Sequence, residues 1–184
     1  FNSRIQLVNF IAMNSYKIKS IRTGGLLITT DTINRMITID YGTAGITDTI
    51  DGDGRLRKGV IKATFDSLWH KPNAKATVEL IGYSVSNNGG VSYIAYSANS
   101  ITIKRIDSIS YNYTITGGNC AGTNYSLGWE TSRSVTQTEG HSTISNVNDD
   151  AYSSTGTSNG VDRNGKSYKV SITSPVVKRT NCAW

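Results

Sequence analysis

The stretch Ile109-Ser-Tyr-Asn-Tyr-Thr-Ile115 decides the fold, because apolar and polar side chains alternate strictly along it. Its four apolar residues fall on one face and its three polar residues on the other. Successive side chains of a β-strand point to opposite faces, so this spacing predicts a strand with one buried and one solvated face. Such strands are typical of antiparallel sheets.

The same alternation recurs along the chain, in residues 33–41, 75–85, 129–135 and 168–172. Turn clusters separate these stretches, and their Asn-Gly, Asp-Gly and Gly-Gly pairs favour tight hairpins. We therefore predict an all-β fold, an antiparallel meander or sandwich of hairpins. In residues 75–85 the alternation predicts that Ala76, Val78 and Leu80 share one face. It predicts that the other face carries Thr77, Glu79, Ile81, Tyr83 and Val85.

The organisation predicted along the chain is a short segment followed by one domain. Residues 1–27 form an N-terminal segment, which could include a short helix, and residues 28–184 form the all-β domain. Residues 53–64 resemble residues 162–173, since each has a turn, a basic residue and an alternating strand. Two interpretations stay open: the domain consists of two similar hairpin units, or two unrelated hairpins look alike.

Composition limits the classes of partner. The net charge of the 184-residue chain is +6, but its lysines and arginines are spread out and no nucleic-acid-binding motif is present. We therefore expect no nucleic acid as a partner. Ser, Thr and Asn supply about a third of the residues, and Thr suits the solvated face of a strand.

No cofactor or metal is expected from the motifs. The stretch Asp51-Gly-Asp-Gly resembles the start of a calcium loop, but Arg55, Arg57 and Lys58 follow it and would repel a cation. His70 and His141 have no metal ligand at a suitable spacing. Phosphate-loop and nucleophile-elbow motifs are absent as well.

Three glutamates are candidates for a glycan hydrolase, which needs two carboxylates close together. They are Glu79, Glu130 and Glu139, and Glu130 follows an aromatic residue of the kind that stacks on sugars. Solvated strand faces normally carry such residues, so we predict a non-enzymatic protein. Aromatic residues instead indicate a ligand-contact surface, with the core face of a sheet as the alternative. The candidates are Trp129, Tyr93, Tyr96, Tyr111 and Tyr113.

The chain has two cysteines, Cys120 and Cys182. A bridge between them would close a loop of about sixty residues and stabilise by roughly 4 kcal/mol on a chain-entropy estimate. Two buried thiols are the alternative.

Several segments together resemble a family of exported lipoproteins of Bacteroidota that has no established activity. The resemblance covers residues 28–184. It rests on Ile37-Thr-Ile-Asp-Tyr-Gly, Gly54-Arg-Leu-Arg-Lys-Gly-Val-Ile, Tyr113-Thr-Ile-Thr-Gly-Gly-Asn-Cys, Asp162-Arg-Asn-Gly-Lys-Ser-Tyr, Ser174-Pro-Val-Val-Lys and Asn181-Cys-Ala-Trp. Members often carry a cysteine after the Asp-Tyr-Gly turn, where this chain has Thr43-Ala-Gly. They also continue beyond the final Cys-x-Trp.

The resemblance implies export to the periplasm or cell surface, with a lipid anchor as the membrane attachment. It also implies O-glycosylation at Asp-Ser/Thr followed by an apolar residue. The matching acceptor residues are Thr32, Thr49, Ser67 and Ser108.

The function expected from the sequence is therefore a binding or scaffold domain of an exported lipoprotein, with other outer-membrane or surface proteins as partners. A carbohydrate-binding module is the first alternative. A glycan-processing hydrolase that uses Glu130 is the second.

Overall fold

The computed structural model describes residues 20–23, 25–47, 53–143 and 146–180. In this part of the chain thirteen strands form one antiparallel sheet, and one short 3₁₀ helix, η1 (Val147–Asp149), is present. The strands are β1 (Ser20–Thr23), β2 (Leu26–Asp31), β3 (Met36–Asp40), β4 (Ile46–Thr47), β5 (Leu56–Phe65), β6 (Lys75–Ser86), β7 (Ile94–Ser97), β8 (Ser100–Arg105), β9 (Ser110–Ala121), β10 (Ser126–Glu139), β11 (Ala151–Val161), β12 (Ser167–Ser171) and β13 (Val176–Arg179). The predicted all-β meander of hairpins is confirmed.

The sheet follows the chain order almost throughout. Its order is β1-β2-β3-β5-β6-β7-β9-β10-β11-β12, so neighbouring strands are mostly joined by hairpins. At three places in the sheet two strands pair with different parts of the same neighbour. Strands β3 and β4 both pair with β5, and β12 and β13 both pair with β11. Strands β7 and β8 both lie between β6 and β9 and pair with both. The described residues form no second sheet, so the sandwich alternative does not apply to them.

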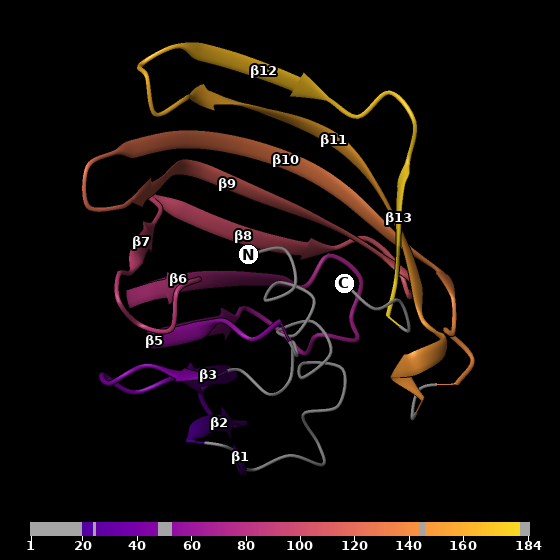
Figure 1. Cartoon of the computed structure of the whole chain (residues 1–184). Helices are drawn as coiled ribbons and strands as arrows, with labels where there is room; N and C mark the ends of the chain where they lie inside the picture. Colours follow the sequence, from indigo (N-terminus) through magenta and orange to yellow (C-terminus); the bar gives the residue numbers. More distant parts are fainter. Residues whose placement is uncertain (1–19, 24, 48–52, 144–145, 181–184) are drawn as a thin grey trace.

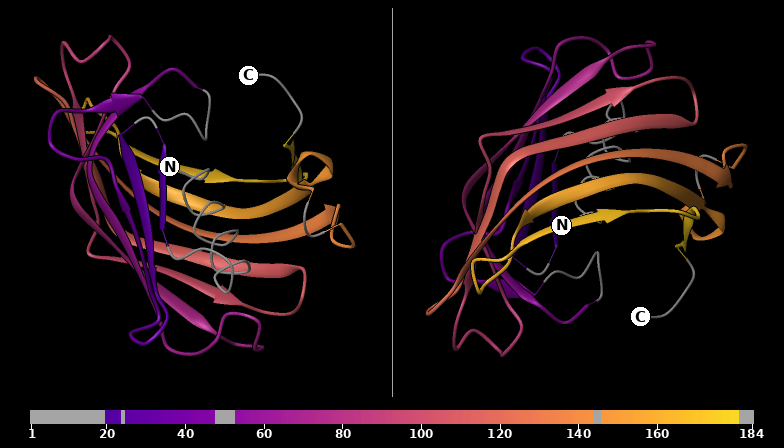
Figure 2. Two further views of the ribbon diagram at one scale, coloured as in Figure 1. Left: turned by 90° about the horizontal axis from the view of Figure 1, so that it is seen from below. Right: turned by 90° about the horizontal axis from the view of Figure 1, so that it is seen from above.

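The sheet bends strongly along its length. In Figure 1, β1 to β6 lie on one side and β9 to β12 arch over on the other, and Figure 2 shows the two halves standing at a steep angle. The buried apolar side chains of successive strands pack into one cluster on one face of the sheet. We call this the core face and the opposite one the outer face.

The core face carries one hydrophobic cluster that runs from β2 to β10. Its largest fully buried side chains are Leu26, Ile28, Ile39, Tyr41, Ile61, Ile101, Ile103 and Ile115. The predicted domain boundary at residue 27/28 is wrong, because it falls inside β2, and β1 already pairs with β2. The predicted N-terminal helix lies in residues outside the described part. The similarity of the two hairpin units stays a prediction.

A β-bulge in β6 corrects the predicted faces of residues 75–85. Lys58 pairs with Ser84 but Val60 pairs with Ile81, so Gly59 alone stands opposite Gly82 and Tyr83. The extra residue reverses the alternation beyond it. Tyr83 and Val85 therefore join the core, at 3% and 7% exposure, while Ile81 stays 51% exposed. The prediction that Tyr83 and Val85 share the face of Thr77 and Glu79 is wrong.

Gly59 is required at this bulge for two reasons. Its φ of +86° lies in the left-handed region, and a Cβ there would lie 2.4 Å from the carbonyl oxygen of Gly82. The close approach of the two backbones leaves no room for a side chain.

We expect Gly59→Ala to lower the free energy of unfolding by more than about 3 kcal/mol, because the left-handed φ alone costs about 1–2 kcal/mol and the clash adds to it. Gly54→Ala is the matched control, since Gly54 also has a positive φ, +68°, but no atom within 4 Å of its Cβ position. Urea denaturation of both variants tests this. Equal losses would contradict the role of the close approach.

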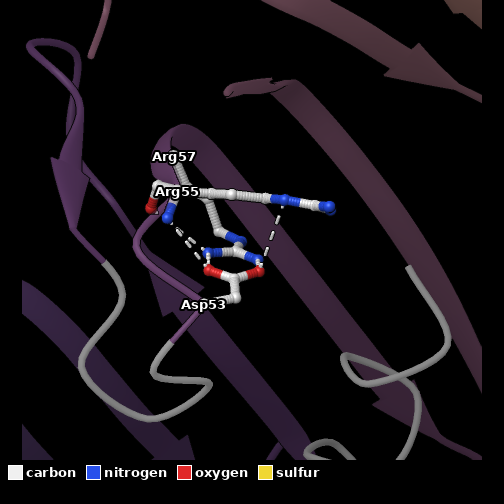
Figure 3. A network of polar contacts seen from close by, with 3 residues as sticks. All are labelled: Asp53, Arg55 and Arg57. Atoms are coloured by element: carbon white, nitrogen blue, oxygen red, sulfur yellow. Dashed lines mark hydrogen bonds and ion pairs between the residues drawn. The ribbon is translucent and has the colours of Figure 1, made fainter. Parts of the chain in front are cut away.

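A buried ion pair stands at the entry to β5. The Arg57 guanidinium is 4% exposed and donates to both carboxylate oxygens of Asp53, at 2.9 and 2.5 Å. Figure 3 shows the two groups face to face, with Arg55 beside them. Burial alone would raise the pKa of Asp53, but the hydrogen bonds from Arg57 and Arg55 outweigh it and hold that pKa at about 2. The side chain of Arg57 thus holds the segment before β5 against the sheet.

We expect Asp53→Asn to destabilise the protein by about 2 kcal/mol, less than the 3–5 kcal/mol of a fully buried pair because the Asp53 side chain keeps 23% exposure. The folded-state pKa of Asp53 is lowered, so its contribution is complete above the unfolded pKa of about 3.9 and is lost as the pH falls through about 2. Denaturation curves at pH 7 and pH 2 test this. The difference between wild type and Asp53→Asn should shrink at pH 2, and an unchanged difference would contradict it.

Candidate functional site

An open groove of about 430 Å³ crosses β9 to β12. This volume is in the range of small-molecule sites. Its lining residues are four glycines, two aromatic residues, three polar residues and one valine: Gly117, Gly118, Gly128, Gly160, Trp129, Tyr168, Glu130, Asn159, Ser167 and Val161. We call it the Trp129–Tyr168 groove.

The two aromatic residues of the groove belong to one cross-strand row. Trp129 of β10 pairs with Gly118 of β9 on one side and with Gly160 of β11 on the other, and Gly160 pairs with Tyr168 of β12. Side chains in one such row share a face of the sheet, so Trp129 and Tyr168 stand on the same face with a glycine between them. Both are half-buried. This spacing leaves a gap flanked by two aromatic side chains.

Glycine at position 118 lets the Trp129 indole lie down on β9. A Cβ on Gly118 would be 2.7 Å from Cε2 of Trp129 and 2.9 Å from Cδ2. The indole meets Tyr96 of β7 edge-on, with 6.3 Å between ring centroids, and Tyr96 in turn contacts Tyr83 at 6.0 Å. The Trp129 wall of the groove is therefore anchored in the core.

Each polar residue of the lining is the sequence neighbour of a member of the Trp129–Tyr168 row, so its side chain points to the opposite face of the sheet. Glu130 and Asn159 are exposed and lie opposite one another on β10 and β11, and Ser167 begins β12. The local backbone is fixed by side chains next to them, since the Ser158 hydroxyl donates to the Glu130 carbonyl oxygen at 2.8 Å. On their own face Trp129 and Tyr168 stand beside glycine backbone, an arrangement that suits a ligand with apolar faces.

The other predicted contact residues lie outside this groove. Tyr111 and Tyr113 are 3% and 4% exposed and belong to the core, so their predicted role in ligand contact is wrong. Tyr96 is half-buried against the core cluster. Tyr93 is half-buried, with the Lys58 ammonium 4.2 Å from its ring centroid. Of the five predicted residues, only Trp129 lines the groove.

Sequence reasoning missed Tyr168, Asn159 and Ser167. The alternation in residues 168–172 predicts that Tyr168 lies on one face of its strand. Whether Tyr168 stands in the same cross-strand row as Trp129 depends on the register of two hairpins. That register is set by pairings between β10, β11 and β12. Asn-Gly pairs favour tight hairpin turns, but the pair Asn159-Gly160 lies inside β11.

The three candidate glutamates do not come together. Glu130 and Glu139 lie nine positions apart on one strand. At about 3.4 Å per residue the distance between them is about 30 Å. Glu139 pairs with Arg179, and Glu79 pairs with Lys62 at 3.9 Å. Glu79 lies on β6, which is three strands away from β10 in the sheet. At about 4.8 Å between neighbouring strands, β6 and β10 are about 14 Å apart. Paired glycosidase carboxylates stand about 5–10 Å apart.

The remaining sequence candidates are placed as follows. His70 and His141 are exposed, and the described residues contain no cluster of His, Cys, Asp or Glu that could hold a metal. Cys120 is buried, which raises the pKa of its thiol, and its predicted partner Cys182 lies outside the described residues. No described helix is long and apolar enough to cross a membrane.

The predicted O-glycosylation sites occupy turns. Thr32 and Ser108 are exposed, Ser67 is half-buried, and Thr49 lies outside the described residues. The preceding aspartates cap these turns: Asp31 accepts the backbone N–H groups of Ile33 and Asn34, and Asp107 accepts those of Ile109 and Ser110. Turn geometry therefore accounts for the aspartates by itself. Glycosylation stays a prediction.

Comparisons of the chain with protein families, with curated proteins and with solved structures gave no match.

Proposed function

We propose that this chain is a non-enzymatic binding domain of an exported protein and that it holds carbohydrate in the Trp129–Tyr168 groove. The observation that carries the proposal is the pair of aromatic side chains that stand on one face of the sheet, in one cross-strand row of the groove lining. Trp and Tyr offer large, rigid surfaces that combine an apolar body with a polar end. Sugars have the matching chemistry, with apolar C–H faces and a rim of hydroxyl groups.

Binding fits the groove better than hydrolysis. A glycosidase places its two carboxylates on either side of the bond that it breaks. Among the described lining residues Glu130 is the one carboxylate, and the other two candidate glutamates lie farther away than that chemistry allows.

We expect Trp129→Ala and Tyr168→Ala each to weaken glycan binding at least about tenfold, since a buried aromatic contact is worth more than about 1 kcal/mol. A glycan array followed by isothermal titration with the best binders would measure the loss. Tyr93→Ala is the matched control, because Tyr93 is equally half-buried but lies outside the groove. Unchanged binding in Trp129→Ala, or an array without any binder, would contradict the proposal.

A second candidate is the scaffold role implied by the lipoprotein resemblance. One observation favours it: β12 ends the sheet, and no described strand pairs with its far side. Exposed valines accompany this edge, namely Val161, Val170, Val176 and Val177. An unpaired edge can accept an extended segment of another protein. In this role the domain would dock a partner at the outer membrane or cell surface.

Cross-linking of the native protein with a lysine-reactive reagent would test the scaffold role. If a partner pairs with the edge, we expect cross-links from Lys166 and Lys169, which are exposed in and beside β12, and few from Lys71, which is exposed in the loop between β5 and β6. A protein that is recovered alone, or cross-links that favour Lys71, would contradict this role.

A further inference from the structure

The face of the sheet that carries Trp129 and Tyr168 continues along the same three strands. Two further rows lie on this face of β10, β11 and β12, because every second residue of a strand points the same way. These rows are Thr131, Ser158 and Val170, then Arg133 and Gly156. Arg133 is the one charged residue among them. Glu130, the carboxylate of the groove lining, points to the opposite face.

The Arg133 side chain reaches the row next to the two aromatic residues. Its Nε donates to the Thr131 hydroxyl at 3.1 Å, and a Cβ on Gly156 would lie 3.1 Å from its Cδ. Glycine at position 156 thus leaves room for this side chain beside β11. Thr131 is two residues from Trp129, or about 7 Å at about 3.4 Å per residue. The guanidinium therefore stands next to the aromatic pair, on the same face.

The Arg133 guanidinium has no counter-ion in the described part of the chain. Of its five N–H groups, one donates to the neutral hydroxyl of Thr131. The buried Arg57, by contrast, donates to both carboxylate oxygens of Asp53. Arg133 is half-buried, and a cation that is partly removed from water is stabilised by an anion. Since a guanidinium binds a carboxylate through two parallel hydrogen bonds, this position favours a ligand with a carboxylate group.

We infer that the Trp129–Tyr168 groove binds a polysaccharide that contains uronic acids, and that Arg133 holds a carboxylate of this ligand. The inference rests on the proposed function and adds the chemical class of the sugar. Trp129 and Tyr168 contact the apolar faces of the sugar rings, and the glycine backbone between them lets the rings approach the sheet. The Arg133 guanidinium donates to the carboxylate oxygens of a ring beside them.

Titrations with matched oligosaccharides test the inference on the wild-type protein. The probes are galacturonic acid and mannuronic acid oligomers of two to four units, and the same oligomers with their carboxylates converted to methyl esters. The esters keep the sugar rings and remove the charge. All titrations use 0.15 M salt, at which the Debye length is about 8 Å, so that the net charge of +6 adds little attraction at long range. For at least one of the two sugars we expect the acid to bind at least about tenfold more tightly than its ester.

Variants assign this preference to Arg133. Arg133→Gln should bind the acid no more tightly than the ester, and the affinity for the ester should stay as in the wild type. Arg133→Lys keeps the charge but not the planar fork, so it should keep part of the preference. Lys169→Gln is the matched control, because it also removes one positive charge but lies in the row of Asn159 on the opposite face, where it is exposed. Its preference should stay within about twofold of the wild type.

The outcomes separate the two levels of the proposal. The inference is overturned, while the proposed function stands, if binding requires Trp129 but uncharged sugars bind as tightly as acids. The same holds if the preference survives in Arg133→Gln or is lost equally in Lys169→Gln. If no oligosaccharide binds, or if Trp129→Ala leaves binding unchanged, the proposed function is overturned and the inference with it. Thermal denaturation identifies a variant that fails to fold, and the comparison of acid with ester on the wild type then decides.

Discussion

A single antiparallel sheet has two faces, and the described chain supplies no second layer to cover either of them. The buried apolar side chains of the sheet pack in one cluster that runs from β2 to β10. The close contact between Gly59 and Gly82 completes this cluster, because the bulge there turns Tyr83 and Val85 into the core. A second irregularity in register, opposite Glu130 on β10, lies next to the groove. A break in the regular register thus occurs both in the core and beside the groove.

The groove follows from this geometry rather than from a dedicated loop. Where the sheet turns from its core-bearing half to its C-terminal half, glycines replace side chains on β9, β10 and β11. The absence of side chains leaves a hollow between the two aromatic residues, and regular strands hold its walls. Sites built on strands are more rigid than sites on loops, which favours recognition of an extended ligand by a preformed surface.

Local alternation was enough to predict most of the fold. It identified the strands around Tyr111 and Tyr113 and the antiparallel pairing, because the period of two is a property of each strand alone. It failed at Tyr83, where a single inserted residue reverses the faces, and it could not distinguish one bent sheet from two packed sheets. For the site it found Trp129 but not Tyr168, because their pairing depends on the register of two successive hairpins. Register and curvature are non-local, and one sequence carries no direct signal for either.

The two walls of the groove differ in how firmly the fold holds them. Trp129 is the last member of a chain of ring contacts that passes through Tyr96 and Tyr83 to the fully buried Tyr41, with centroid distances of 5.9–6.3 Å. Tyr168 instead lies on β12, a strand of five residues that pairs with β11 alone. An edge strand with few buried contacts opens more easily than the core. A ligand that bridges both side chains would therefore connect this edge strand to the aromatic contacts of the core, and by mass action part of its binding free energy would stabilise the edge.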